Sequence, residues 1–269
     1  MARTDTVFSG SIPQLYDRYL GPLLFEPYAA DLTRRLSSMT SGQVLETAAG
    51  TGIVTCALAA ALPLSIEIVA TDLNQPMLDH AAAKAGLSRV RFQRADALAL
   101  PFPDESFDAV VCQFGVMFFP DRVAGMREAQ RVLKPGGRFL FSVWDRLEDN
   151  PVMAVTIAGL AARYPAHPSW FLERTPCGYR DPGEIRADLR DAGFSDITIE
   201  TVRLAGHAQD ANGPAIGHCQ GTPMRAEIEA LDPGGLEGAT EAAAAAIATR
   251  FGDGPFEVLL QALVVEAVA

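Results

Sequence analysis

Lysine and long apolar stretches are both scarce in this sequence. Among 269 residues the only lysines are Lys84 and Lys134, and the formal net charge is −11. The arginines are scattered, so most of the surface would repel the phosphate backbone of a nucleic acid. No apolar run is long enough to span a bilayer, and the N-terminus lacks the apolar core of a secretion signal. We therefore expect a cytoplasmic protein with no nucleic-acid partner and no membrane association.

Cysteine and histidine are also few, and their spacing matches no metal site. The four cysteines are far apart, without a CxxC pair, and the four histidines show no metal-ligand spacing. We expect the cysteines to be small buried residues in a reducing cytosol and expect no bound metal. A hydrophobic content of 49% with 20% charged residues indicates a globular protein with a large core. The length allows one α/β domain with additions, or two small domains.

A regular alternation of strand and helix patterns begins near residue 43. The expected strands are Gln43–Thr47, Ile66–Thr71, Val90–Ala95, Phe107–Cys112 and Arg138–Trp144. The expected helices between them are Gly52–Ala61, Pro76–Ala85 and Asp121–Leu133, the last followed by a Pro-Gly-Gly turn. Strands separated by helices indicate a doubly wound α/β fold, with a mostly parallel sheet and helices on both faces.

The segments on either side of this core have a different character. Residues 11–37 read as a helical cap whose prolines break the run. Residues 145–182 and 205–250 read as mainly helical insertions, separated by a helix over Pro182–Ala192 and a strand over Ile197–Leu204. The last part of Phe256–Val268 should form the final strand. Because no repeat or low-complexity linker interrupts the chain, we expect a single domain, 1–269, with its cofactor-binding core at 40–145.

Three carboxylates stand at the ends of the first three expected strands, beside a turn of small residues. Glu46 ends the first strand, Asp72 the second, and Asp96 follows the third. Ligands of open α/β sheets bind outside the carboxyl ends of the strands, and an acid after the second strand commonly accepts hydrogen bonds from both ribose hydroxyls. Glu46 is placed to attract a cation, and Asp96 could accept a hydrogen bond from an adenine amino group. The set suits a ligand with ribose, adenine and a positive charge better than a pyrophosphate.

Several motifs occur together over roughly residues 40–145, in one order and at one spacing. They are VLETAAGTG (44–52), ATDLNQPML (70–78), RADAL (94–98), PFPDESFDAV (101–110), QFGVMFF (113–119) and RVLKPGGR (131–138). With them the chain resembles the class I S-adenosylmethionine-dependent methyltransferases, in the branch of the ubiquinone/menaquinone-biosynthesis enzymes. The resemblance implies a Rossmann-like sheet of seven strands, the last antiparallel, and S-adenosylmethionine as cofactor. One departure is Ala48, which stands where the family usually has the first glycine of the turn.

The resemblance also implies a role for individual residues. Glu46 and the turn with Ala48, Gly50 and Gly52 would hold the methionine part, and Asp72 the ribose hydroxyls. The remaining expected contacts are Leu73 and Met77 along the adenine, Asp96 and Ala97 at its ring edge, Gln113 and Phe114 closing the site, and Tyr16 and Tyr19 over the methionine end. An aromatic ring beside a sulfonium also fits cation–π attraction. Plainer alternatives are that Asp72 caps a helix, Asp96 is a turn residue, and the aromatic side chains only pack.

Methyl transfer from a sulfonium is an in-line displacement, so positioning and a dry site carry most of the catalysis. No residue stands out as a general base. His167, in the expected lid over residues 145–182, is a candidate, with a surface or structural role as the alternative. The aromatic and alanine-rich cap and insertions favour a small, largely apolar organic acceptor over a protein or nucleic acid. Two other functions stay open at this point: a nicotinamide-dependent oxidoreductase, and a non-catalytic S-adenosylmethionine-binding protein. The methylated atom and the oligomeric state are not specified by the sequence.

Overall fold

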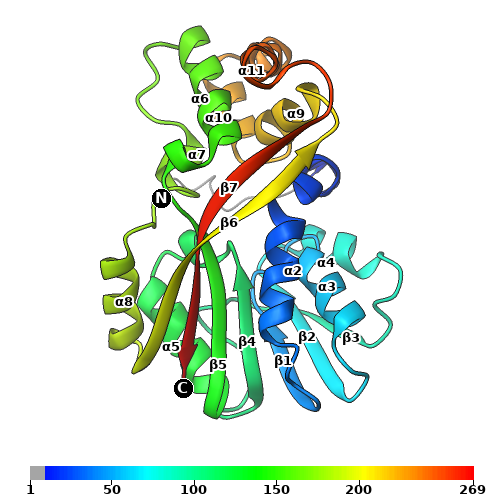
Figure 1. The fold of residues 1–269 in the computed structure, drawn as a ribbon, viewed down its shortest axis with the longest axis vertical. Helices are drawn as coiled ribbons and strands as arrows, with labels where there is room; N and C mark the ends of the chain where they lie inside the picture. The colour runs from blue at the N-terminus through cyan, green and yellow to red at the C-terminus, as the bar shows by residue number, and fades with distance from the viewer. Residues whose placement is uncertain (1–9) are drawn as a thin grey trace.

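The computed structural model describes residues 10–269, and within them seven strands form one sheet (Figure 1). The strands lie in the order β3-β2-β1-β4-β5-β7-β6. They are β1 (Gly42–Glu46), β2 (Ile66–Asp72), β3 (Val90–Arg94), β4 (Phe107–Gln113), β5 (Leu133–Trp144), β6 (Asp196–Ala208) and β7 (Phe256–Val268). Neighbours from β3 to β5 are parallel, whereas β7 is antiparallel to both β5 and β6. The expected mostly parallel sheet with an antiparallel last strand is confirmed.

The order of the strands reverses at β1. From β1 the chain moves outward to β2 and β3, and then returns to place β4 on the other side of β1. The carboxyl ends of β1 and β4 therefore border a topological switch point, where ligands of open α/β sheets bind. Both strands are mostly buried, because the apolar residues in each are covered on both faces of the sheet.

Helices cover both faces of the sheet, as the alternating pattern predicted. The helices α2 (Glu26–Arg35) and α3 (Ile53–Ala61) contact each other, and α4 (Gln75–Ala82) packs on β2 and β3. The helices α5 (Arg122–Val132) and α8 (Pro182–Asp191) contact each other on the other side of the molecule (Figure 1). Aspartates mark where the last two begin: the carboxylate of Asp121 accepts from Ala124 N at 2.9 Å, and that of Asp181 from Gly183 N at 2.7 Å.

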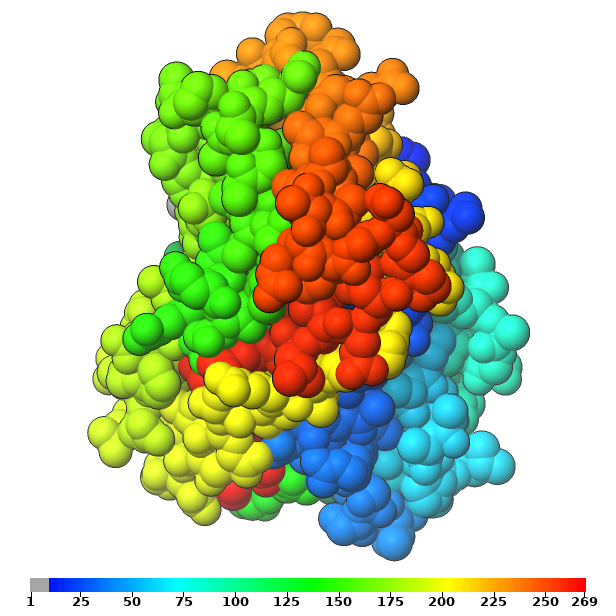
Figure 2. Space-filling view, turned by 45° about the horizontal axis from the view of Figure 1, so that its top comes forward, coloured from blue at the N-terminus to red at the C-terminus, as the bar shows by residue number. Residues whose placement is uncertain are grey.

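A second group of helices lies above the carboxyl ends of the parallel strands, and we call it the helical lobe (Figure 1). Its members are α6 (Pro151–Arg163), α7 (Phe171–Arg174), α9 (Asn212–Gln220), α10 (Met224–Leu231) and α11 (Leu236–Phe251). Figure 2 shows α6, in green, and α11, in orange, lying against each other at its surface. No helix within residues 10–269 combines the length and apolarity needed to cross a membrane.

The N-terminal cap is one helical run, and the expectation that prolines break it is wrong. It comprises α1 (Ile12–Leu15), a π-helix η1 (Tyr16–Phe25) and α2. Pro13 lies in the first turn of α1, at the start of the run, where no N–H is needed, and Pro27 lies in the first turn of α2. Pro22 lies inside η1, whose wider turn is seen where Glu26 N donates to Gly21 O, five residues back.

The strands β6 and β7 are longer than the sequence pattern indicated. They pair over thirteen residues, from Asp196 opposite Val268 to Ala208 opposite Phe256. The strand β5 pairs with β7 only up to Trp144, so the upper parts of β6 and β7 continue as a two-stranded ribbon into the helical lobe (Figure 1). The second insertion therefore occupies residues 209–255, where the sequence pattern placed it at 205–250.

Candidate active site

The turn after β1 is held by backbone hydrogen bonds to both neighbouring strands. Thr47 N donates to Val111 O, and Ala49 N donates to Thr71 O, each at 2.9 Å. Gly52, the residue before α3, has φ +79°, and a Cβ built on it would lie 2.8 Å from Ala81 Cβ. Glycine is therefore required there by the close approach of α3 and α4. At Gly50, by contrast, a Cβ would meet no atom of residues 10–269 within 4 Å, so its backbone faces open space.

Ala48 takes the place of a glycine both in sequence and in backbone conformation. Its φ is +52°, in the left-handed region that alanine occupies at a cost. Gly115, after β4, makes room for the extra methyl group, because a Cβ on Gly115 would lie 2.6 Å from Ala48 Cβ. The methyl group of Ala48, which replaces the usual glycine of the family turn, is thus accommodated because Gly115 has no side chain.

Asp72 presents its carboxylate between two backbone donors. Gly50 N donates to Oδ2 and Asn74 N donates to Oδ1, both at 2.8 Å. The side chain is 7% exposed, and this burial raises the pKa of Asp72 above its usual value. Oδ1 also accepts from Asn74 Nδ2 at 3.4 Å, whereas Oδ2 accepts from Gly50 N and can accept a further hydrogen bond.

A cleft of about 380 Å³ opens at the switch point, in front of Asp72 and the turn. Ten of the residues predicted for the cofactor line it: Tyr16, Ala48, Gly50, Asp72, Leu73, Met77, Asp96, Ala97, Gln113 and Phe114. Seven lining residues were not predicted: Asn74, Ala95, Leu98, Gly115, Phe118, Phe119 and Pro120. Most of these lie next to predicted residues in the sequence, inside or beside the same motifs. Extending each predicted contact to its neighbours in the motif would have included them.

Glu46 and Tyr19 lie outside the lining of the cleft. Thr55 Oγ1 donates to Glu46 Oε2 at 2.5 Å, behind the turn, and burial raises the pKa of Glu46 to about 8. Tyr19 turns away from the cleft and packs on α9, where a Cβ on Gly213 would lie 3.3 Å from its ring. Gly52 is also absent from the lining, because it belongs to the contact between α3 and α4.

His167 belongs to a polar cluster that ties α7 to α10. Its Nε2 lies 3.3 Å from Glu227 Oε1, and its ring stacks on Trp170 at 4.1 Å. Glu227 also accepts from Arg174 at 2.7 Å and from Phe171 N at 3.0 Å. Since His167 lines neither the cleft nor the cavity described next, this geometry favours the structural alternative.

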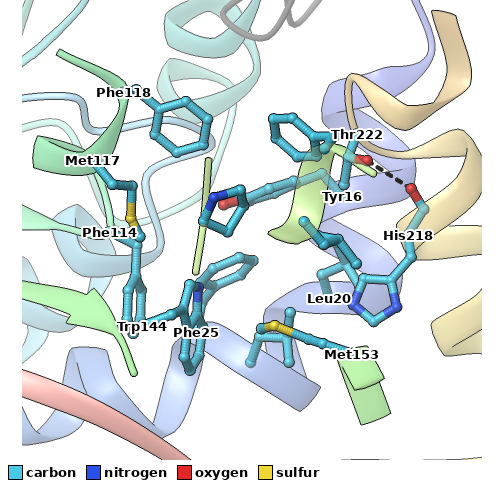
Figure 3. A pocket seen from close by; sticks show the side chains of 14 residues that line it. Tyr16, Leu20, Phe25, Phe114, Met117, Phe118, Trp144, Met153, His218 and Thr222 are labelled. Carbon is cyan, nitrogen blue, oxygen red and sulfur yellow. Dashed lines mark hydrogen bonds between the residues drawn. The ribbon is translucent and has the colours of Figure 1, made fainter. Parts of the chain in front are cut away.

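A second cavity lies between the sheet and the helical lobe, next to the cleft (Figure 3). We call it the apolar cavity; its open volume is about 40 Å³. It is lined by Tyr16, Leu20, Leu24, Phe25, Phe114, Met117, Phe118, Trp144, Met153, Phe171, Leu172, Pro176, His218 and Thr222. Tyr16, Phe114 and Phe118 line the cleft too, so these three rings stand at the boundary between the two spaces.

Stacked aromatic rings fix this boundary. The ring of Phe114 lies flat on Trp144, with centroids 3.8 Å apart, and Tyr16 stacks on Phe25 at 4.7 Å. Phe114 has φ +52°, and its N–H donates to Ser142 O at 3.0 Å. A bulky residue in this conformation carries backbone strain, which the surrounding packing must offset.

Several known proteins are similar to this chain in amino-acid sequence. The profile of a family described as "Methyltransferase domain" matches residues 45–141. The ubiquinone/menaquinone biosynthesis C-methyltransferase UbiE of Ectopseudomonas mendocina is 31% identical over 213 residues, covering 74% of this chain and 78% of that protein. The demethylmenaquinone methyltransferase of Deinococcus radiodurans is 36% identical over 168 residues, covering 56% of this chain and 67% of the relative.

Solved structures agree at the level of the fold. Phosphoethanolamine N-methyltransferase 2 of Haemonchus contortus, in complex with S-adenosyl-L-methionine, superposes with a TM-score of 0.59 at 17% identity. The match covers 95% of this chain and 56% of that one. The family profile, the relatives and the fold together define a Rossmann-like methyltransferase.

More narrowly, the chain belongs to the S-adenosylmethionine-dependent methyltransferase family that includes UbiE and the demethylmenaquinone methyltransferases. It is accordingly an enzyme that uses S-adenosylmethionine as its methyl donor, and the alternative of a nicotinamide-dependent oxidoreductase is rejected.

Proposed function

We propose that the enzyme transfers the methyl group to a small, largely apolar organic acceptor held in the apolar cavity, which must enlarge to admit it because its open volume is only about 40 Å³. The observation that carries the proposal is the shared boundary: Tyr16, Phe114 and Phe118 border both the cleft and the apolar cavity. An acceptor on one side of this boundary would face a methyl donor on the other, as in-line displacement requires. The names of the two relatives, which refer to demethylmenaquinone and to ubiquinone/menaquinone biosynthesis, support an apolar ring as the acceptor.

Buried polar side chains of the cleft are placed to hydrogen-bond the cofactor. We assign Asp72 to the ribose hydroxyls, because its carboxylate is fixed by two N–H groups and Oδ2 retains a free lone pair. Gln113 Oε1 is buried without a hydrogen-bond partner among residues 10–269, while Nε2 donates to Phe25 O at 3.2 Å. That orphaned oxygen would accept a hydrogen bond from the bound cofactor, since burying it unpaired is costly. Leu73 and Met77 would contact the adenine, with Asp96 and Ala97 at its edge.

Glu46 would attract the positively charged cofactor electrostatically, from behind the turn that contacts it. The carboxyl lies directly behind the turn and has no cationic partner within salt-bridge distance in the described chain. A positively charged ligand in the cleft would favour its ionised form and lower its pKa from about 8. When bound, the cofactor supplies the activated methyl group, and the residues around it supply orientation and exclude water.

The proposal is tested by offering the purified enzyme isotopically labelled S-adenosylmethionine with three acceptor classes. These are apolar ring compounds such as 1,4-naphthohydroquinone, total tRNA, and a mixture of proteins. We expect label to enter the ring compounds alone, and analysis of the product identifies the methylated atom. Label appearing in tRNA or protein, with none in the small molecules, would overturn the proposed acceptor class.

A further inference from the structure

Asp17, the second residue of η1, joins the N-terminal cap to α4 through two side-chain contacts. Lys84, just after the end of α4, donates from Nζ to Asp17 Oδ1 at 2.6 Å, and His80 Nε2 lies 3.3 Å from Asp17 Oδ2. The side chains of Asp17 and Lys84 are 25% and 23% exposed, so solvent screens their attraction less than that of a fully exposed pair. Burial alone would raise the pKa of Asp17, but the hydrogen bond and charge of Lys84 outweigh it and lower the pKa, which keeps the carboxylate ionised.

The residue before Asp17 forms one wall of the cleft. Tyr16 is the only residue of the cap among those that line the cleft within residues 10–269, since the others lie between Ala48 and Pro120 in the core. Consecutive residues have Cα atoms only about 3.8 Å apart, so a movement of Asp17 away from α4 would carry Tyr16 with it. The contacts of Asp17 with α4 therefore help to hold this wall in place.

The other side of η1 packs closely on α9 of the helical lobe (Figure 1). A Cβ on Gly217 would lie 2.5 Å from Leu20 Cδ2, and one on Gly221 would lie 3.0 Å from Tyr16 N. Such close-packed contacts cannot separate without opening a cavity, whereas a partly exposed ion pair can exchange its partner for water. The boundary between η1 and α4 is therefore where the start of the cap can part from the core.

We propose that the ion pair of Asp17 and Lys84 is a latch that controls exchange of the cofactor. While the pair is formed, it holds Tyr16 as a wall of the cleft; when it breaks, α1 and the start of η1 move away, and S-adenosylmethionine enters or S-adenosylhomocysteine leaves. Asp17 and Lys84 are positioning residues, since neither lines the cleft. The inference rests on the proposed function, which assigns the cofactor to the cleft.

A latch of this kind changes the rates of exchange more than the affinity. The pair joins two side chains outside the cleft, so it forms whether or not the cleft is filled. Breaking it raises the open fraction of enzyme with and without ligand, and association and dissociation then accelerate by the same factor. For an ion pair of this exposure we expect about fivefold in each rate, and a dissociation constant within about twofold of the native value. Loss of a direct contact, or partial unfolding, would instead weaken the affinity.

The test measures the association and dissociation rates of S-adenosylhomocysteine by stopped-flow tryptophan fluorescence, and its affinity by calorimetry. We expect both rates to rise about fivefold in Asp17→Asn and less in Lys84→Met, which keeps His80. The double variant should be no faster than Asp17→Asn, because both changes remove one pair. The matched control is Lys134→Met: Lys134 pairs with Asp108 at 2.7 Å near the amino ends of β5 and β4, away from the cleft, and should leave both rates unchanged. Native rates in Asp17→Asn, or faster dissociation with unchanged association, would overturn the inference.

A second measurement needs only the native enzyme. Raising the salt concentration from about 0.05 M to about 0.5 M screens a partly exposed ion pair, so dissociation of S-adenosylhomocysteine should accelerate several-fold. A rate that does not change with salt contradicts the inference. The assignment of the cofactor to the cleft fails separately, if Asp72→Ala binds S-adenosylhomocysteine as tightly as native enzyme does. If Asp72→Ala binds weakly while Asp17→Asn exchanges the ligand at the native rate, only the latch is wrong.

Discussion

Ala48 shows how a single methyl group is accommodated in a turn that normally requires glycine. Its left-handed backbone is strained, and Gly115 offsets the crowding by having no side chain. We predict that Ala48→Gly leaves stability unchanged or raises the free energy of unfolding by up to about 1 kcal/mol, because relief of strain exceeds the added freedom of the unfolded chain. Urea denaturation measures it. The neighbour Ala49 has no positive φ, so Ala49→Gly should destabilise; equal losses for both variants would contradict the prediction.

Asp72 should dominate the affinity for the cofactor. Replacing it with alanine removes a fixed carboxylate and leaves Gly50 N without its acceptor. We predict that Asp72→Ala binds S-adenosylhomocysteine roughly ten- to a hundredfold more weakly, as expected for lost hydrogen bonds to a charged group. Calorimetry provides the measurement. Asp79→Ala is the control, because Asp79 is an exposed carboxylate of α4 outside the cleft, and its affinity should equal that of the native enzyme.

Glu46 should make stability depend on pH in an unusual direction. Its pKa is about 8 in the folded enzyme and has its ordinary value of 4.5 in the unfolded chain. Between these values the folded state holds more protons, so the contribution of Glu46 to stability falls as pH rises from about 5 to about 8. We predict that the free energy of unfolding of native enzyme declines relative to that of Glu46→Gln over this range. Denaturation of both proteins at three pH values tests it, and a constant difference would show that the pKa is not raised.

At the scale of elements, the π-helix η1 borders both the cleft and the apolar cavity. Tyr16, its first residue, lines both spaces. We predict that S-adenosylhomocysteine slows hydrogen exchange of the backbone amides in η1 several-fold, since a ligand under Tyr16 opposes local opening. Exchange in α8, on the far side of β6 from the cleft, should not change. Mass spectrometry of peptides measures the exchange rates of both helices. Equal slowing of exchange in η1 and α8 would indicate only global stabilisation and contradict the prediction.

The sequence predicted most elements because hydrophobic periodicity is local. The strands β1 to β4 and the helices between them follow their patterns to within about three residues. The N-terminal cap was different, because the rule that proline breaks helices does not anticipate a π-helix around Pro22. The length of β6 was also missed, since its half-exposed alternation over Asp196–Ala208 gains its partner only from β7, some sixty residues later.

At the scale of the whole molecule, the charge of −11 should govern its choice of partners. We predict no binding of duplex DNA or tRNA at micromolar concentration and physiological salt. An acidic protein surface offers too few basic side chains to displace the counterions of either nucleic acid. Fluorescence anisotropy of labelled nucleic acid measures this. Binding that weakens steeply as salt is added would reveal a basic patch and contradict the prediction.

The cleft and the apolar cavity differ in how far a sequence can predict them. The residues of the cleft come from consecutive motifs, so their order along the chain already placed Asp72, Gln113 and Phe114 together. The apolar cavity draws side chains from η1, β5, α6, α7 and α9, and it exists only once these elements pack. Neither the neighbours of His218 in sequence nor its spacing indicates that it lines a cavity.

The ribbon of β6 and β7 carries residues 209–255 of the helical lobe, whereas α6 and α7 follow β5 along the chain. The thirteen residue pairs of these two strands place Ala208 opposite Phe256, so the two ends of residues 209–255 lie side by side. Residues 209–255, including His218, can therefore diverge during evolution as a replaceable cassette, while the strands keep its ends anchored. The same cofactor core could thereby serve new acceptors, with matching changes in α6 and α7, which border the apolar cavity as well.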